Sequence, residues 1–298
     1  MNHMISLRQV QRFVFFLFVC VGFVSTAAGQ NGSRFSFAAP VSLDTPAPQV
    51  ALADFNRDGK PDVATATGAQ DPTNPGKIVL YLGNGDGTFQ PRREWDYRPL
   101  VGANPYPPGA VADFNGDGYL DYAMGHGGST GLPNGFGNQV SIHLGDGAGN
   151  LLPFSKFYSG GSGIPLVAAD FNEDGRIDLL AKTGDDMSVR LHLGNGDGTF
   201  ASGGTIICRP GYYGNMVGAD VNKDGHSDAV VTGRTSDVFV LLGAGTGAFD
   251  VRTISLPRLN HLIAVGDLNA DTNLVLSCTS KRYMSDCRHE QTSGSDFS

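Results

Sequence analysis

Acidic side chains recur in this chain at a spacing that suits the binding of a cation. Four segments share the form D-x-N-x-D-G-x-x-D, and they begin at Asp54, Asp113, Asp170 and Asp220. Alternate positions of such a loop carry oxygen side chains, and the glycine permits a sharp turn, so the oxygens converge on one point. Carboxylates together with neutral oxygens are the ligands of a hard cation, and a flexible loop favours Ca²⁺ over Mg²⁺. Each segment therefore predicts a calcium site.

The predicted ligands occupy positions 1, 3, 5, 7 and 9 of each segment, and position 7 contributes its backbone carbonyl. These residues are Asp54, Asn56, Asp58, Lys60 and Asp62; Asp113, Asn115, Asp117, Tyr119 and Asp121; Asp170, Asn172, Asp174, Arg176 and Asp178; and Asp220, Asn222, Asp224, His226 and Asp228. Without a cation the clustered carboxylates repel each other, so we expect about four bound Ca²⁺ ions, one for each loop.

Two alternatives for these segments are weighed against the calcium loop. An EF-hand shares the first six positions, but it needs a bidentate Glu at position 12, where this chain has Thr65, Met124, Ala181 and Val231. Strand-like runs flank the segments, which also disfavours an EF-hand or a dockerin. The other alternative is a plain turn rich in Asp, Asn and Gly. Four copies at regular spacing argue against it.

A fifth copy of the motif is degenerate. Asp267, Asn269 and Asp271 hold positions 1, 3 and 5, but Thr272 replaces the glycine and Val275 replaces the last aspartate. We expect weak or absent calcium binding there.

Short apolar runs surround each acidic segment and define the elements that must position it. In each repeat one run precedes the segment, a second follows it, a third precedes a glycine turn such as LGNGDGTF from Leu82, and a fourth follows that turn. Short runs between turn signals predict antiparallel strands, and four strands in a repeat of about 50 residues predict a β-propeller blade. The first run is rich in Ala and Gly, which suits a crowded innermost strand.

The predicted fold class is therefore all-β, a β-propeller of four-stranded blades with four full repeats and a degenerate fifth. The stretch FSFAAPVSL from Phe35 resembles a lone fourth strand whose blade the C-terminus would complete. After Leu276 the sequence has neither strand alternation nor a glycine turn. Either five blades close the ring, or the chain is truncated from a larger propeller, and we favour truncation. The expected domains are residues 30–276 for the propeller and 277–298 for an irregular tail.

The combination of DFNGDG at Asp113 with LGNGDGTF resembles the FG-GAP and VCBS-type repeat, which is the blade unit of integrin α-subunit propellers and of many secreted bacterial proteins. The resemblance covers about Phe35 to Leu276. It implies that the four loops are Ca²⁺ sites in hairpins between the first and second strands of a blade. It does not single out one function, because the family includes adhesins, receptor head domains and accessory modules of extracellular enzymes.

The N-terminus is typical of a secretory signal peptide, over residues 1–29. Arg8 and Arg12 precede the apolar run 13–24, which is shorter than the roughly 20 residues that span a bilayer, and small residues follow. We therefore expect a secreted protein, or one in the periplasm or at the cell surface, with no membrane span after cleavage. Disulfides are possible there, and Cys278 and Cys287 either pair or remain free thiols. The net charge of −8 argues against a nucleic-acid partner.

The sequence favours a non-enzymatic recognition or adhesion module, because no nucleophile, base or open metal site accompanies the repeats. We expect a protein or carbohydrate ligand on a propeller face, since loops on a rigid scaffold commonly bind partners. Aromatic and basic residues between the first two acidic segments form either such a binding edge or a loop that covers the blade. They are Arg92, Arg93, Trp95, Tyr97, Arg98 and Tyr106. The alternatives are an accessory or catalytic propeller of an extracellular polysaccharide-active enzyme, or the product of a truncated gene.

Two further features have structural interpretations. His143 and His192 occupy the same strand position in successive repeats, where the other repeats have Tyr81 and Leu241. A position that accepts Tyr or Leu is structural, so these histidines do not indicate a zinc site. The segment 125–129, GHGGS, is expected to be a flexible loop between strands.

Overall fold

The computed structural model describes residues 50–67, 76–96, 103–105, 109–128, 139–159, 166–183, 188–208, 215–232, 237–255, 263–266 and 275–278. In these residues the regular structure is all-β, and no helix occurs, as the sequence predicted. The strands are β1 (Ala51–Ala53), β2 (Asp62–Ala66), β3 (Lys77–Tyr81), β4 (Arg93–Asp96), β5 (Ala103–Pro105), β6 (Ala110–Ala112), β7 (Asp121–Gly128), β8 (Gln139–Gly145), β9 (Leu151–Tyr158), β10 (Leu166–Ala169), β11 (Asp178–Lys182), β12 (Ser188–Gly194), β13 (Phe200–Ile207), β14 (Met216–Ala219), β15 (Asp228–Thr232), β16 (Asp237–Gly243), β17 (Phe249–Ser255), β18 (Ile263–Gly266) and β19 (Val275–Cys278).

Three of the four full repeats each form one antiparallel sheet whose strands follow each other in sequence order. Sheet 1 has the order β1-β2-β3-β4, sheet 3 has β10-β11-β12-β13, and sheet 4 has β14-β15-β16-β17. The degenerate fifth repeat contributes the two-stranded sheet β18-β19. Four consecutive strands for each full repeat match the predicted blades.

Sheet 2 contains a strand that the sequence did not predict. Its path is β5-β7-β8-β9, and β6 pairs with the start of β7 while β5 pairs with its end. The two short strands share β7 because that strand is eight residues long. The expectation of a flexible loop over 125–129 is wrong for residues 125–128, because these residues pair with β5 and β8 as part of β7.

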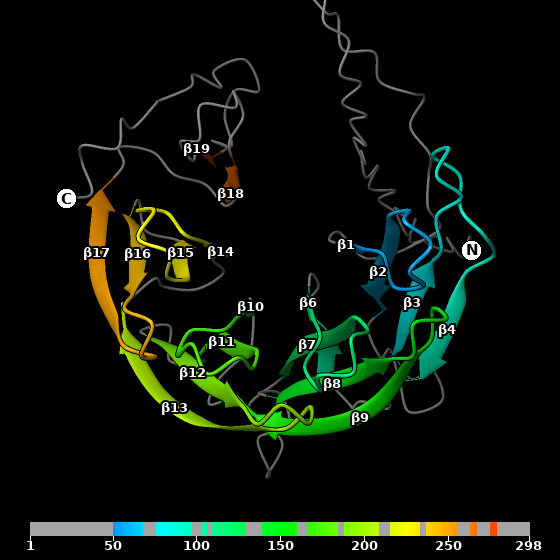
Figure 1. Cartoon of the computed structure of the whole chain (residues 1–298), viewed down its shortest axis with the longest axis horizontal. Coiled ribbons are helices and arrows are strands. Elements are labelled where there is room, and N and C mark those ends of the chain that lie inside the picture. Colours follow the sequence, from blue (N-terminus) through cyan, green and yellow to red (C-terminus); the bar gives the residue numbers. More distant parts are fainter. Residues whose placement is uncertain are drawn as a thin grey trace, which may run out of the picture.

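The sheets stand side by side around an arc, with their first strands on the inside (Figure 1). Contacts join β1 to β6, β6 to β10, β10 to β14 and β14 to β18, so successive inner strands are neighbours. Small side chains on these strands, such as Ala51, Ala110 and Ala168, permit this close approach. The arc of described strands is open and forms no closed propeller. The predicted strand from Phe35 and the tail after residue 278 lie outside the described residues.

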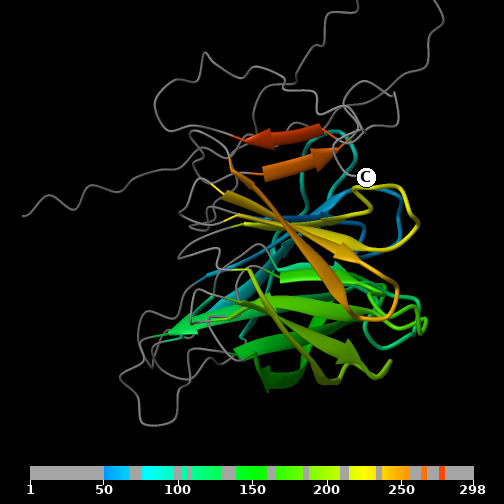
Figure 2. The ribbon, with the colours of Figure 1, turned by 90° about the vertical axis from the view of Figure 1, so that its left-hand side faces the viewer.

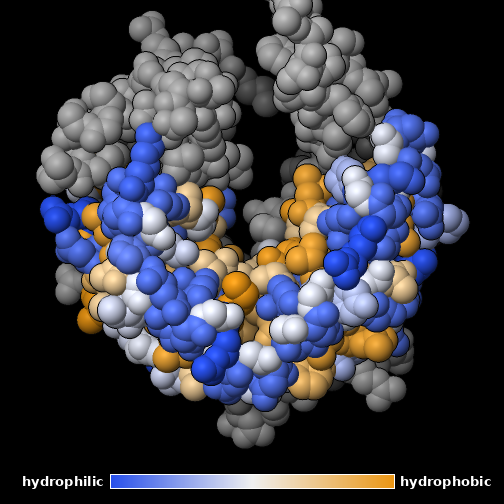
Figure 3. Space-filling model, viewed as in Figure 1, coloured by the Kyte–Doolittle hydropathy of each residue, from blue (hydrophilic) through white to orange (hydrophobic). Residues whose placement is uncertain are grey.

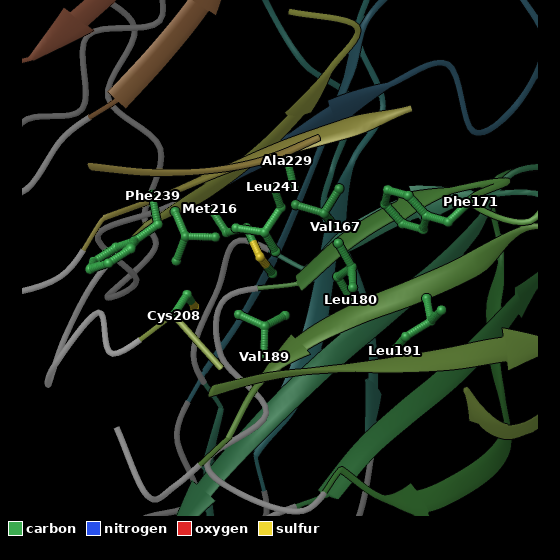
Figure 4. Packing of buried hydrophobic residues seen from close by; sticks show 11 residues of the cluster. Val167, Phe171, Leu180, Val189, Leu191, Cys208, Met216, Ala229, Phe239 and Leu241 are labelled. Atoms are coloured by element: carbon green, nitrogen blue, oxygen red, sulfur yellow. The ribbon is translucent and has the colours of Figure 1, made fainter. Parts of the chain in front are cut away.

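Apolar side chains between adjacent sheets form the core. The first layer joins sheets 1 and 2, the second joins sheets 2 and 3, and the third joins sheets 3 and 4. Figure 4 shows the third layer, in which Leu180 and Val189 of sheet 3 face Ala229 and Leu241 of sheet 4. Figure 3 shows apolar residues along the inner side of the arc, smaller apolar patches on its outer side, and hydrophilic residues over much of the rest of the face in view. Each sheet thus depends on its neighbours for burial of its faces.

Candidate metal centres

The four acidic loops connect β1 to β2, β6 to β7, β10 to β11 and β14 to β15, which are the first and second strands of each predicted blade, as the FG-GAP resemblance implied. They begin at Asp54, Asp113, Asp170 and Asp220 and are numbered 1 to 4 here. The glycine turns, which begin at Gly83, Gly145, Gly194 and Gly243, connect the third and fourth strands. Because the strands are antiparallel, the acidic loop and the glycine turn lie at the same end of the strands in each sheet. Figure 2 shows these hairpin loops together on one side of the molecule.

Loop 3 illustrates how the residues of each acidic loop bond to one another. Asp170 accepts hydrogen bonds from the backbone N–H groups of Asp174 at 3.1 Å and Gly175 at 2.8 Å. Asn172 Oδ1 also accepts from the Asp174 N–H, at 3.1 Å, and its Nδ2 donates to Asp174 Oδ2 at 3.1 Å. Asp174 Oδ1 accepts from the Arg176 N–H at 2.9 Å. The side chains at positions 1, 3 and 5 therefore gather around the loop backbone.

The same bonds recur in the other three loops. The backbone is left-handed at position 6, where Gly175 has φ 82°, and also at position 4, where Glu173 has φ 57°. Glycine adopts this conformation without the steric cost that a Cβ imposes, which explains the glycine at position 6 of all four loops.

The aspartate at position 9 has a different environment from those at positions 1 and 5. Asp178 is completely buried, and its two carboxylate oxygens accept hydrogen bonds from the Phe171 N–H at 3.0 Å and the Gly194 N–H at 2.8 Å. Phe171 belongs to the acidic loop and Gly194 opens the glycine turn. Asp62, Asp121 and Asp228 make the equivalent pairs of bonds. Position 9 therefore connects the two hairpin turns within each sheet.

Burial raises the pKa of all four position 9 aspartates, and in the case of Asp121 it raises the pKa to about 6. The two backbone N–H donors act in the opposite direction. The neighbouring carboxylates at positions 5 and 1, which are Asp117 and Asp113 in this loop, raise the pKa further. The carboxylates at positions 1 and 5 thus lie close enough to disfavour the charged form of the carboxylate at position 9.

The donor set of each loop suits a hard cation. All of its candidate ligands are oxygens, from carboxylates, an amide and a backbone carbonyl, which is the chemistry that Ca²⁺ prefers. In the part of the chain that the structure describes, no three His, Cys, Asp or Glu side chains are grouped so as to hold a metal ion. The side chains at positions 3 and 5 bond instead to the loop backbone and to each other. Calcium would therefore require these side chains to rotate inward, using oxygen lone pairs that the N–H donors leave available.

Comparison with protein families supports the repeat assignment. Residues 54–124 match the family model described as FG-GAP-like repeat, from the start of loop 1 into β7. The chain therefore carries FG-GAP-type repeat sequence over these residues. No curated protein matches its sequence.

Two solved structures resemble the FG-GAP chain. Rhamnogalacturonan lyase YesW matches with 16% sequence identity and a TM-score of 0.44, over 78% of this chain and 46% of the lyase chain. The V. cholerae biofilm matrix protein Bap1 matches with 23% identity and a TM-score of 0.38, over 78% of this chain and 34% of its own. The FG-GAP chain thus spans less than half the length of either protein. Among its described residues no helix has both the length and the apolar character needed to cross a membrane.

The predicted ligands at positions 1 to 9 of loops 1 to 4 all lie within the described residues, and each loop brings its own five residues together in one hairpin. Residues 267–274 of the degenerate fifth loop lie outside the described residues. Its weak or absent calcium binding therefore stays a prediction.

A buried polar group in sheet 2 was not expected from the sequence. Ser141 Oγ lies 2.7 Å from His126 Nε2 and 3.0 Å from His143 Nε2, and all three side chains are buried. Burial lowers the pKa of His126 to about 4 and that of His143 to about 3. His192 of sheet 3 is likewise buried, with its pKa lowered to about 4. Both His143 and His192 thus lie inside the FG-GAP core, where the structural interpretation expects them.

Of the aromatic and basic residues that follow loop 1, Arg93 and Trp95 lie in β4 of sheet 1, and Arg92 directly precedes that strand. Arg93 Nη1 donates to the carbonyls of Ala148 at 2.8 Å and Gly149 at 2.9 Å, in the glycine turn of sheet 2. Trp95 packs on the apolar layer between sheets 1 and 2. Arg92 pairs with Glu94 at 2.7 Å. The remaining members, Tyr97, Arg98 and Tyr106, lie outside the described residues.

Proposed function

We propose that this chain is an extracellular, calcium-binding module of the β-propeller type that recognises a protein or carbohydrate without catalysing a reaction. The observation that carries the proposal is the shared geometry of the four acidic loops. Each loop has the same hydrogen-bond pattern and the same all-oxygen donor set. All four loops lie at the same end of the strands of their sheets. A plain turn has no need of such a donor set.

Calcium would act as a structural ion in this proposal. Positions 1, 3, 5 and 9 and the carbonyl of position 7 would hold it. Its charge would offset both the burial of the position 9 carboxylate and the repulsion from positions 1 and 5, which together raise the pKa of that carboxylate. Because position 9 also bonds the glycine turn, the ion would stabilise both hairpin turns of a sheet. Extracellular calcium modules commonly bind with Kd of about 10⁻⁴–10⁻³ M, so the sites would fill outside the cell.

A recognition role is supported by the kind of scaffold that these sheets provide. Stacked sheets hold their connecting loops in place, and loops on a rigid scaffold are where binding residues concentrate. Ser141, the one described serine flanked by two histidines, is 1% exposed and therefore cannot reach a substrate. We propose that the partner binds to loops on one face of the stacked sheets.

Thermal unfolding in calcium and in chelator tests the ion. At a free Ca²⁺ concentration about ten times Kd, each site adds about 1.4 kcal/mol to the free energy of unfolding, so four sites add about 5–6 kcal/mol. For a domain of this size the melting temperature should rise by about 10–20 °C. Mg²⁺ at the same concentration is the control and should give a smaller rise. Identical melting curves in calcium and chelator would refute a structural ion.

Binding and turnover assays separate the recognition module from the polysaccharide-active enzyme. The purified chain is incubated with a set of extracellular polysaccharides in calcium and in chelator, and both retention and new chain ends are measured. The recognition module predicts calcium-dependent retention without new chain ends. Catalytic release of fragments, lost on mutation of a loop residue, would favour the enzyme instead.

A further inference from the structure

Neighbouring acidic loops contact each other through the side chain at position 4. Glu173 of loop 3 reaches loop 4, where its Oε1 lies 2.5 Å from Nδ1 of His226. Arg57 of loop 1 reaches loop 2, where its Cζ lies 5.3 Å from the centre of the Tyr119 ring. His226 and Tyr119 both occupy position 7, so the contact joins the same two positions at both junctions.

The two residues at position 4 that contact the next loop both have a left-handed backbone conformation. Arg57 and Glu173 have φ values of 59° and 57°, although neither is glycine. A residue with a Cβ has a steric cost in this conformation. The conformation persists only where the surrounding structure stabilises it. At the junction between loops 2 and 3, position 4 is Gly116, so no side chain can reach Arg176 at position 7 of loop 3.

The residue at position 7 is confined on its other side by the glycine turn of its own sheet. A Cβ added at Gly147 would lie 2.3 Å from the Tyr119 ring. One added at Gly245 would lie 2.8 Å from His226 Nδ1 and 2.7 Å from the Glu173 carboxylate. Position 7 is therefore packed between its own glycine turn and position 4 of the preceding loop. Its backbone carbonyl is a proposed calcium ligand, so the preceding loop helps to place that ligand.

We infer that Glu173 and Arg57 are positioning residues that couple calcium binding at neighbouring loops, so that loops 3 and 4 form one cooperative pair and loops 1 and 2 another. The inference rests on the proposed calcium sites. Ordering of one loop by its ion fixes position 4, which fixes position 7 of the next loop, and thermodynamic linkage makes the effect reciprocal. Contacts of this type at exposed sites change a coupled affinity by about twofold to fivefold.

The pair formed by loops 3 and 4 is tested in a chain whose loops 1 and 2 are silenced by Asp58→Ala and Asp117→Ala. Calorimetric titration with Ca²⁺ should show two ions, the second bound about twofold to fivefold more tightly than independent equal sites allow. Glu173→Ala should abolish this cooperativity while both ions still bind. Alanine is chosen over glycine because it keeps a Cβ, and so leaves the left-handed backbone cost unchanged. Glu173→Gln, which retains an oxygen acceptor for His226, should retain most of the cooperativity.

Two further variants control for trivial effects on the loops. Lys223→Ala trims the same position in loop 4, where the backbone φ is 62°, and should leave the cooperativity between loops 3 and 4 intact. Gly116→Glu, with loops 1 and 4 silenced, should create coupling between loops 2 and 3 through Arg176. A Cβ at Gly116 would approach only the Gly196 carbonyl, at 3.8 Å, and the φ of 75° would impose the same kind of backbone cost that Glu173 already bears.

The outcomes distinguish the coupling from the calcium sites themselves. Two bound ions with cooperativity that survives Glu173→Ala would overturn the coupling and leave the proposed calcium function standing. No calcium uptake by the parent chain would overturn both. Loss of cooperativity in Glu173→Ala together with its appearance in Gly116→Glu is the expected result.

Discussion

The buried aspartate at position 9 should be more important for folding than any other acidic residue of its loop, even without calcium. In loop 3 the substitution Asp178→Ala removes the acceptor of two buried N–H groups, those of Phe171 and Gly194. The acidic loop and the glycine turn would then lose the side chain that joins them. Asp174→Ala, at position 5 of the same loop, is the matched control, because its hydrogen bonds are exposed.

The expected cost follows from these bonds. A buried donor left without an acceptor costs about 1–3 kcal/mol, so two donors cost about 2–6 kcal/mol. Removing a carboxylate whose pKa is raised by burial returns part of its desolvation energy, which places the expected loss for Asp178→Ala at about 2–4 kcal/mol. Asp174→Ala should cost no more than about 0.5 kcal/mol in chelator, as is usual for a surface substitution.

Urea and thermal unfolding in chelator measure the difference. Asp178→Ala should lower the melting temperature by about 5–15 °C, and Asp174→Ala should leave it nearly unchanged. Adding calcium should then reveal a loss in Asp174→Ala as well, of about 1.4 kcal/mol at ten times Kd, because one site is missing. Asp178→Asn should not restore stability fully, since an amide offers one acceptor oxygen and turns a donor toward the second N–H.

Equal losses for Asp178→Ala and Asp174→Ala in chelator would refute the reasoning. Such a result would mean that the buried hydrogen bonds to Phe171 and Gly194 contribute nothing beyond the exposed bonds of the loop. A small loss for Asp178→Ala in chelator combined with a large one in calcium would assign position 9 to the ion alone.

Two further predictions concern a buried histidine and the glycine turn. Because burial lowers the pKa of His192 to about 4, the unfolded chain binds a proton below pH 6.5 that the folded chain does not, so the free energy of unfolding falls as pH drops from 6.5 toward 4. His192→Leu, which copies Leu241 of sheet 4, should weaken this fall relative to the parent, as measured by urea unfolding at pH 7 and pH 4.5. Gly194→Ala should destabilise the chain more than Gly175→Ala, although only Gly175 has a positive φ (82°), because a Cβ at position 194 would lie 2.2 Å from the Ile177 carbonyl oxygen. Thermal unfolding of both variants checks the order, and the reverse order would show that the backbone yields to the close contact.

The strands and hairpins could be predicted from local sequence because turn-forming motifs separate the strands within each repeat. The D-x-N-x-D-G segments and glycine turns lie between apolar runs of strand length, and the structure places those runs in consecutive antiparallel strands. The segment around His126 was misjudged for the opposite reason. Its glycines suggested a loop, but pairing with β5 and β8 holds it as a strand, and pairing of this kind overrides local preference.

Side-chain roles within the loops were only partly readable from the motif. Spacing indicates that positions 1 to 9 belong together, but it gives all three aspartates the same role. The structure separates Asp178, which is buried and bonded to two turns, from Asp170 and Asp174, whose hydrogen bonds are exposed. That distinction depends on Gly194, which is 16 residues away in sequence.

The sequence by itself determined the all-β class, the four full repeats and the all-oxygen loops, because turn chemistry and short apolar periods act over a few neighbouring residues. Only the tertiary structure decided how one repeat meets the next. The contact of Glu173 with His226 spans 53 residues, and the Arg93 bond to Gly149 spans 56. Such contacts follow from the stacking of whole sheets, which is driven by burial of apolar faces that no single repeat can cover alone.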